Sequence, residues 1–326
     1  MVVEVFELEK HLASPLLPKN RQCRIDAVLI LSGVLTRRLN RDKLYAVAWY
    51  EKSYYSTKIR QGGQYRVLPR VAIVGIGFTP FQTITPDVSF KEMMFEAATK
   101  AYEDAGVCPQ HDIDGFVTCE EDFAHGRSIF SIHTPDNLRA VLKPIHTIPG
   151  DGIHGLIAGY MQISTGLMDI VAVESHSKAS NMLTTNYLIA LALDPVYNNP
   201  LGYNPYFITG MEMNRYLYET GTTKEQCALV AVKNRLNALL NPQAAYGERI
   251  TVDEALDSEI MFYPLSRLDV SCPADGGIVM VLASEEKAKT LSDTPIWIRG
   301  VGWCSGAPSL ETSEGVENAS RQSCSG

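Results

Sequence analysis

The sequence predicts an α/β protein in which a mixed sheet surrounds a buried central helix. Two observations support this class. From residue 70 onward, short apolar runs alternate with helical segments. Within residues 145–180, a tight turn, a small-residue helix, an apolar strand and a polar end follow one another directly. Ligands of open α/β sheets bind near helix N-termini and the C-terminal ends of strands, so we expect the functional site in this segment.

Composition excludes several classes of protein. The chain has 326 residues, of which 45% are hydrophobic and 20% charged, as in water-soluble globular proteins. No apolar run approaches the roughly 18–20 residues that span a bilayer, and no signal-peptide pattern opens the chain. Seven scattered cysteines form no CxxC pair, which favours reduced thiols and a cytoplasmic location. The net charge of −8 argues against nucleic acid as a partner.

Residues 1–69 differ from the rest in charge and pattern. Residues 1–70 carry a charge of about +7 and lack clean periodicity. One interpretation is a basic arm that binds RNA or another anionic surface. The interpretation that we favour is a basic leader, poorly ordered or upstream of the true start of the domain.

The first ordered elements follow residue 70. VAIVGIGF (71–78) predicts a buried strand, and FKEMMFEAATKAYEDAGV (90–107) predicts a helix that ends at Gly106. Its predicted buried face comprises Phe90, Met94, Ala97, Ala98, Ala101 and Tyr102. IDGFVTCEE (113–121) predicts the next strand. The Gly-Ile-Gly at 75–77 lacks the third glycine of a dinucleotide fingerprint, because position 80 is proline, so we do not expect NAD.

The central segment combines these signals. A glycine-containing turn at 149–152 leads into a small-residue helix over 155–163, which Ser-Thr-Gly at 164–166 ends. An apolar strand over 170–173 follows, with polar residues 174–178 at its end.

Residues 181–266 predict an insertion that folds over the sheet as a lid. Two helices are expected in it, over 209–221 and over 223–240. The second begins with a capping box of Thr223 and Gln226.

The sheet pattern returns after the lid. Residues 268–288 predict a turn, a buried strand (278–283) and an acidic helix start. IWIRGVGWCSG (296–306) repeats the pattern of residues 71–81, which indicates a duplicated unit whose second copy has just begun. We assign 70–180 with 267–290 to one α/β half, and 291–326 to the first strand of the second half and a polar tail.

Residues 71–310 resemble the thiolase superfamily. The similarity is to archaeal thiolase-like acetyl-CoA acyltransferases and to the sterol-carrier-protein type of thiolase domain. The matching pieces are VAIVGIGFTPF, AYEDAGV, IDGFVTCEE, the central helix with its Ser-Thr-Gly stop, VKNRLNALLNPQA (232–244) and CPADGGIVMVLASE (272–285).

This resemblance implies an acyl-CoA substrate and two βαβαβαββ halves packed in five layers, as a homodimer. It implies a cysteine nucleophile at the N-terminus of the central helix, with a histidine and a second cysteine from the second half, for Claisen condensation or thiolysis. No cofactor is implied beyond the coenzyme A of the substrate. A small zinc-ribbon/OB-fold partner protein accompanies relatives of this type.

The sequence departs from this catalytic pattern. Counting back from the Ser-Thr-Gly stop places the nucleophile position at about Pro149, and no cysteine lies between Cys119 and Cys227. The last histidine is His176, and Cys324 lies in the patternless tail. A Cys-His-Cys mechanism cannot be assembled from these residues.

Asp151 and His154 flank the expected nucleophile position. One hypothesis makes them a carboxylate–imidazole acid/base pair for a retro-aldol or other lyase reaction on an acyl-CoA. The alternative makes Asp151 the N-cap of the central helix and His154 a packed residue of its first turn.

The other candidate site residues also have a purely structural interpretation. We assign substrate or coenzyme A binding to Gly150, Gly152, Lys178 and Ser180, although structural roles are common for such positions. His176 is expected at a surface strand tip, and Cys272 and Cys304 as packing residues. No metal site is expected.

Three hypotheses for function remain open. The first is a thiolase-like enzyme that acts on acyl-CoA thioesters, as an acyltransferase or a cysteine-free carbon–carbon lyase. The second is a non-catalytic subunit that binds acyl-CoA or scaffolds a true thiolase. The third is a truncated gene product, which the nucleotide sequence beyond codon 313 would test.

Overall fold

The computed structural model describes residues 69–119, 132–182, 194–196, 200 and 206–304. It also describes three short strands before residue 69: β1 (Val2–Val3), β2 (Lys58–Gln61) and β3 (Gln64–Val67). β2 pairs with β3, and β1 pairs with β12 (Trp303–Cys304). The remainder of the predicted leader and tail lies outside the described residues.

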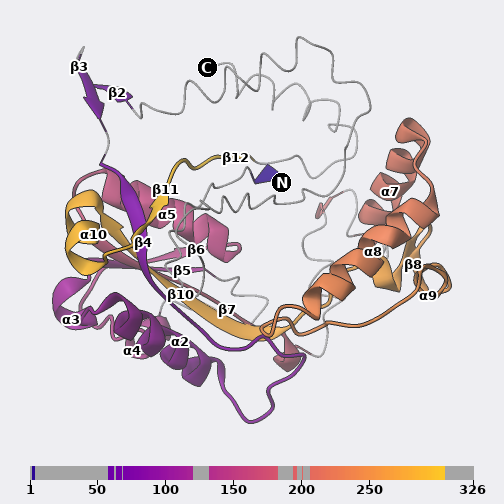
Figure 1. The fold of residues 1–326 in the computed structure, drawn as a ribbon, viewed down its shortest axis with the longest axis horizontal. Coiled ribbons are helices and arrows are strands. Elements are labelled where there is room, and N and C mark those ends of the chain that lie inside the picture. Colours follow the sequence, from indigo (N-terminus) through magenta and orange to yellow (C-terminus); the bar gives the residue numbers. More distant parts are fainter. Residues whose placement is uncertain are drawn as a thin grey trace, which may run out of the picture.

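One six-stranded mixed sheet forms the centre of the molecule, in the order β11-β4-β10-β7-β5-β6 (Figure 1). Strands β5, β6 and β7 run parallel, whereas β10 is antiparallel to both β7 and β4. The bounds are β4 (Val71–Phe78), β5 (Gly115–Cys119), β6 (Ile145–Ile148), β7 (Ile170–Lys178), β10 (Asp275–Ser284) and β11 (Ile296–Ile298). The predicted mixed sheet is confirmed.

Strand β11 pairs antiparallel with β4 at the edge of this same sheet. The assignment of its sequence to a second α/β unit stays a prediction. A short helix, α10 (Glu285–Leu291), joins β10 to β11 and confirms the acidic helix start.

Helix α2 (Phe90–Ala105) covers one face of the sheet. A capping box begins it, in which the Ser89 amide donates to Glu92 Oε2 over 2.8 Å, and Gly106 ends it at φ 65°. All six residues of the predicted apolar face are buried. The helix lies directly on β4, because a Cβ on Gly77 would be only 2.1 Å from the Ala97 carbonyl oxygen.

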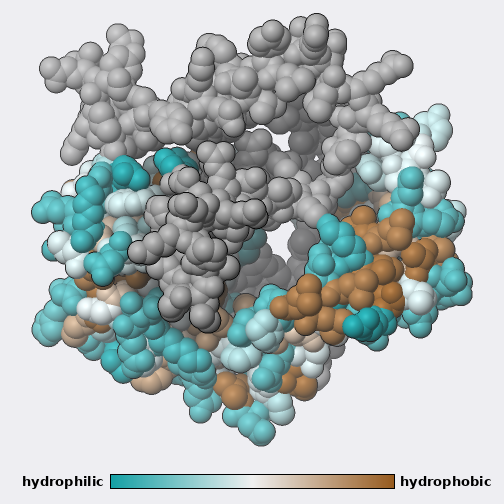
Figure 2. All heavy atoms as spheres, viewed as in Figure 1, coloured by the Kyte–Doolittle hydropathy of each residue, from teal (hydrophilic) through white to brown (hydrophobic). Residues whose placement is uncertain are grey.

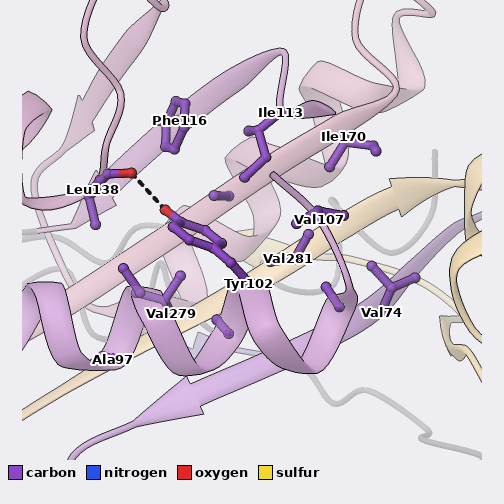
Figure 3. Packing of buried hydrophobic residues seen from close by; sticks show 14 of the residues in the cluster. Val74, Ala97, Tyr102, Val107, Ile113, Phe116, Leu138, Ile170, Val279 and Val281 are labelled. Atoms are coloured by element: carbon purple, nitrogen blue, oxygen red, sulfur yellow. Dashed lines mark hydrogen bonds between the residues drawn. The ribbon is translucent and has the colours of Figure 1, made fainter. Parts of the chain in front are cut away.

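Tyr102 forms a buried polar contact in the core between α2 and the sheet. The Tyr102 hydroxyl donates to the Leu138 carbonyl over 2.9 Å, amid the side chains shown in Figure 3. Burial, together with the nearby Glu174 carboxylate, raises the pKa of Tyr102 above its usual value. Two short helices, α3 (Pro109–Asp112) and α4 (Thr134–Asn137), complete this side.

Helix α5 (Gly152–Ser164) covers the opposite face and is the predicted buried central helix. Its glycines allow close contact with the strands. A Cβ on Gly155 would be 2.0 Å from Cys119 Sγ, and one on Gly159 would be 2.8 Å from a methyl of Leu282. The small residues of this helix therefore set its distance from the sheet.

Strand β7 is longer than predicted. We expected it to end at Val173 with a polar tip, but it continues to Lys178. The expectation that His176 is a surface residue is wrong, because its side chain is fully buried. The buried Glu174 and Lys178 have polar partners on neighbouring strands, Thr118 on β5 and Asp275 on β10.

The predicted lid is largely helical. It contains α7 (Phe207–Thr220), α8 (Lys224–Ala238), α9 (Val252–Leu256) and the hairpin of β8 (Ile260–Phe262) and β9 (Leu265–Ser266). Both predicted helices are confirmed, as is the capping box of Thr223 and Gln226. These elements group beside the sheet (Figure 1), and the Tyr246 hydroxyl donates to the Pro273 carbonyl over 2.6 Å. Its role as a lid stays a prediction.

Much of the apolar side of α8 is exposed. Figure 2 shows apolar side chains gathered over this part of the surface. The exposed apolar residues of α8 are Leu229, Val230 and Leu236, and the exposed Leu239 and Leu240 follow directly after the helix. In the part of the chain that the structure describes, no helix is long and apolar enough to cross a membrane.

Candidate functional site

The site begins at the N-terminus of α5. Strand β6 ends at Ile148, and the chain turns through Gly150 at φ 131° before Asp151 caps the helix. Asp151 Oδ1 accepts from the amides of Ile153 (3.1 Å) and His154 (3.4 Å). The capping role of Asp151 is confirmed.

The same carboxylate oxygen also contacts the His154 imidazole. Asp151 Oδ1 lies 3.0 Å from His154 Nδ1, with side-chain exposures of 62% and 17% respectively. The two residues therefore form the predicted pair while Asp151 caps the helix. A carboxylate at Nδ1 favours the tautomer with its proton on that nitrogen, which leaves Nε2 as the basic atom.

The glycines around this pair are sterically constrained. A Cβ on Gly150 would be 2.9 Å from His154 Nδ1, so any other residue would press against the imidazole. A Cβ on Gly152 would be 3.2 Å from Ser175 Cβ and 3.5 Å from its hydroxyl oxygen. The first turn of α5 thus lies directly on β7 at Ser175.

The C-terminal end of β7 has two chemically different faces. On the α2 side, Glu174, His176 and Lys178 are buried and paired. On the α5 side, Ser175 and Ser177 are only partly buried. Alternation along a strand places these two sets on opposite sides of the sheet.

A buried acid–imidazole pair lies on the α2 side. Glu174 Oε1 is 2.8 Å from His176 Nδ1, and its other oxygen accepts from the Thr118 hydroxyl over 2.6 Å. The Phe90 ring stacks on the imidazole, with 5.9 Å between the ring centroids. This cluster was not predicted from the sequence, although the alternation of Glu174 and His176 along a strand was the available signal.

Asp275 organises the second buried cluster and was also missed. Its carboxylate is 2.8 Å from Lys178 Nζ and accepts from the Ser180 hydroxyl (2.6 Å) and the Thr85 hydroxyl (2.7 Å). Burial would raise the pKa of Asp275, but these hydrogen bonds outweigh it and hold the pKa well below its usual value.

This cluster brings Lys178 and Ser180 together, since both bind Asp275. Lys178 also donates to the carbonyl and hydroxyl oxygens of Thr85. Their contact with substrate or coenzyme A, like that of Gly150 and Gly152, stays a prediction.

The described cysteines place no exposed thiol at the start of α5. Cys119 is buried against Gly155, and Cys272 is partly exposed. The side chain of Cys304 lies outside what the structure describes. The arrangement at the helix N-terminus therefore offers acid–base chemistry through an imidazole and a carboxylate.

An apolar hollow of about 390 Å³ lies between the segment that follows α8 and the residues that flank the end of β4 and the start of β10. It is lined by Phe81, Ala238, Asn241, Gln243, Ala244, Ala245, Tyr246 and Ala274. Phe81 also packs where a side chain on Gly276 of β10 would lie, which connects the hollow to the α5 side of the sheet.

Comparison with known proteins supports the resemblance drawn from the sequence. The chain is 31% identical over 247 residues to the acetyl-CoA acetyltransferase of Methanothermobacter thermautotrophicus, which covers 74% of this chain and 63% of that protein. It is 30% identical over 256 residues to the steroid side-chain-cleaving aldolase of Thermomonospora curvata, with the same coverage of 74% and 63%. No protein-family model matches the chain.

A solved structure agrees with these relatives. The Ltp2-ChsH2(DUF35) aldolase superposes with a TM-score of 0.60 at 28% identity, over 74% of this chain and 63% of that one. The fold and site thus define a layered α/β protein. A central helix of small residues packs on its sheet, and polar residues lie at the C-terminal end of β7. The chain belongs to the thiolase superfamily. It spans 63% of the length of the relatives described above.

Proposed function

We propose that the whole protein acts on acyl-CoA thioesters as a cysteine-free carbon–carbon lyase. The observation that carries this is the Asp151–His154 pair, with 3.0 Å between carboxylate and imidazole, at the N-terminus of the central helix. Residues 120–226 contain no cysteine, and Cys119, whose Sγ lies against Gly155 of this helix, is only 1% exposed, so the described residues offer no accessible thiol for an acyl-enzyme there. Relatives named as an acetyltransferase and as an aldolase support acyl-CoA chemistry of either kind.

Retro-aldol cleavage fits an imidazole base because it needs no covalent intermediate. The neutral His154 Nε2 removes the proton from the β-hydroxyl of a 3-hydroxyacyl-CoA. The Cα–Cβ bond then breaks, which releases a ketone or aldehyde, and its electron pair moves onto the thioester as an enolate. The imidazolium returns the proton to Cα and gives acetyl-CoA. Atoms and electrons balance without a cofactor.

The proposal also covers the location of the protein, its oligomeric state and its partner. We expect a cytoplasmic homodimer that works beside a small zinc-ribbon/OB-fold protein. The Ltp2-ChsH2(DUF35) aldolase, whose name joins two proteins, supports a partner protein of some kind. No cofactor is proposed beyond the coenzyme A of the substrate.

The test is cleavage of 3-hydroxyacyl-CoA by the full chain, alone and with a candidate partner, with acetyl-CoA measured over time. We expect His154→Ala to lower turnover by about 100-fold or more and Asp151→Asn by about 10-fold or more, in line with general acid–base catalysis. His111→Ala, an exposed histidine on α3, is the matched control and should retain activity. Retained activity in both site variants would overturn the mechanism. Acyl-CoA binding without turnover would favour the non-catalytic subunit instead.

A further inference from the structure

The α5 side of β7 carries hydroxyl groups that the fold does not use. Within the described part of the chain, neither Ser175 nor Ser177 forms a side-chain hydrogen bond, and both are partly buried. The polar side chains of the opposite face, Glu174 and Lys178 among them, are buried and bonded. A partly buried hydroxyl without an internal partner is available to a ligand.

The close packing of α5 on β5 and β7 places Ser175 beneath the first turn of α5. A Cβ on Gly152 would lie 3.2 Å from Ser175 Cβ. Cys119, which pairs with Ser175 across the β5–β7 ladder, lies in the same way beneath Gly155. The Ser175 side chain is thus held next to the helix turn that carries the Asp151–His154 pair. Ser177 lies two residues further along the same face of the strand, and it is not among the atoms nearest to a Cβ on any glycine of α5.

We propose that Ser175 donates a hydrogen bond to the thioester carbonyl oxygen of the substrate and stabilises the enolate that forms there. This inference rests on the proposed lyase function and adds a group that sequence and relatives do not assign. When the Cα–Cβ bond breaks, negative charge develops on the thioester oxygen, and a donor already in place lowers the barrier. The proton that reaches Cα comes from His154, so Ser175 keeps its own proton throughout.

Kinetics of Ser175→Ala and Ser177→Ala give the first test. We expect Ser175→Ala to lower kcat by about 10- to 100-fold with KM changed by less than about 3-fold, because a donor that acts mainly in the transition state affects kcat. Ser177→Ala, the matched control on the same face, should stay within about 2-fold of wild type. Ser175→Cys, with a similar volume but a weaker donor, should fall between wild type and Ser175→Ala. Equal loss in both alanine variants would overturn the proposal.

Binding gives a readout that does not need turnover. Calorimetry would compare acetyl-CoA with S-ethyl-CoA, in which a methylene replaces the carbonyl. Wild type should prefer acetyl-CoA by about 3- to 10-fold, the value of one hydrogen bond, and Ser175→Ala should lose that preference. If wild type discriminates and Ser175→Ala does so equally, the role of Ser175 is refuted while acyl-CoA binding stands. If wild type binds neither compound, the proposed function fails, and the role of Ser175 with it.

Discussion

Asp275 and Lys178 show how a buried charge pair links three segments of this chain. The Asp275 side chain is 0% exposed and that of Lys178 4%. Thr85 comes from the loop before α2, and Ser180 from the short 3-10 helix after β7. The carboxylate therefore connects segments that are about one hundred or more residues from it along the chain.

We expect Asp275→Asn to lower the free energy of unfolding by about 3–5 kcal/mol, because it leaves the Lys178 ammonium buried without its counter-charge. Glu285→Gln removes one partner of the exposed Lys289 ion pair and should cost about 1 kcal/mol or less. Urea denaturation of both variants measures the difference. Similar small losses in the two would show that Lys178 relaxes to water without cost.

The depressed pKa of Asp275 predicts a specific dependence on pH. Since the folded carboxyl has a lower pKa than the unfolded one, the native state binds fewer protons below about pH 4, the usual range of aspartate. Its contribution to stability is therefore complete above that pH and is lost as the pH falls toward the folded pKa. Melting curves from pH 6 to pH 2 should decline less steeply for Asp275→Asn than for wild type. Parallel curves would contradict this.

Gly150 tests the site at a single residue. An alanine there would adopt a strained φ of 131° and place its Cβ 2.9 Å from His154 Nδ1. We expect Gly150→Ala to cost about 1–3 kcal/mol of stability and to lower turnover at least about 10-fold by displacing the imidazole. Gly221→Ala has a positive φ of 67° but no atom within 4 Å, so it should lose about 1–2 kcal/mol and keep full activity. Full activity of Gly150→Ala would show that the imidazole position is unimportant.

At the scale of elements, helix α5 depends on glycine for its contact with the sheet. Gly155→Ala would bring a methyl group to 2.0 Å from Cys119 Sγ and 2.9 Å from a methyl of Val173. We expect a loss of about 2–4 kcal/mol from this overpacking. Cys119→Ala removes the nearer obstacle, so the double variant should be more stable than the sum of the two single losses predicts. Strict additivity in urea denaturation would show that the helix shifts as a whole.

Strand β7 shows what the sequence could and could not predict. Its apolar start, from Ile170 to Val173, was predictable. The glycine turn and the small-residue helix α5, which precede the strand, indicated where to expect the candidate site. The last five residues look like a polar loop in sequence, because two of the buried ones, Glu174 and Lys178, have partners elsewhere in the chain: Thr118 on β5 and Asp275 on β10. A local sequence pattern cannot predict hydrogen-bond partners that are distant along the chain.

The same reasoning applies to the site. The Asp151–His154 pair could be predicted because both residues belong to one helix turn, three positions apart. The position of Ser175 depends instead on how closely α5 packs against β7, which glycine at 152 permits. The distance between α5 and β7 is a property of the fold, so the position of Ser175 relative to α5 cannot be predicted from its place in the strand sequence.

At the scale of the whole molecule, burial is unevenly divided between the sheet and the α7–α9 elements. The two large core clusters draw on the sheet, its covering helices and the segments that connect them, and neither includes a buried residue of α7–α9. In α8 the one residue described as buried is Ala228. Cooperative units with few buried contacts open at lower free energy than a core does, so the two parts should differ in local stability.

Helices α2 and α8 make a matched comparison of this difference. They are 16 and 15 residues long, and both begin with a capping box. The two helices therefore have similar local helix signals, whereas α2 lies on the sheet and α8 exposes Leu229, Val230 and Leu236. In native-state hydrogen exchange followed by mass spectrometry, we expect α8 amides to exchange at least about 100-fold faster than those of α2, which corresponds to about 3 kcal/mol in opening free energy. Equal protection that is lost on dilution would show that a second protein copy covers the α8 face; equal protection at all concentrations would show that burial within the chain does not set local stability here.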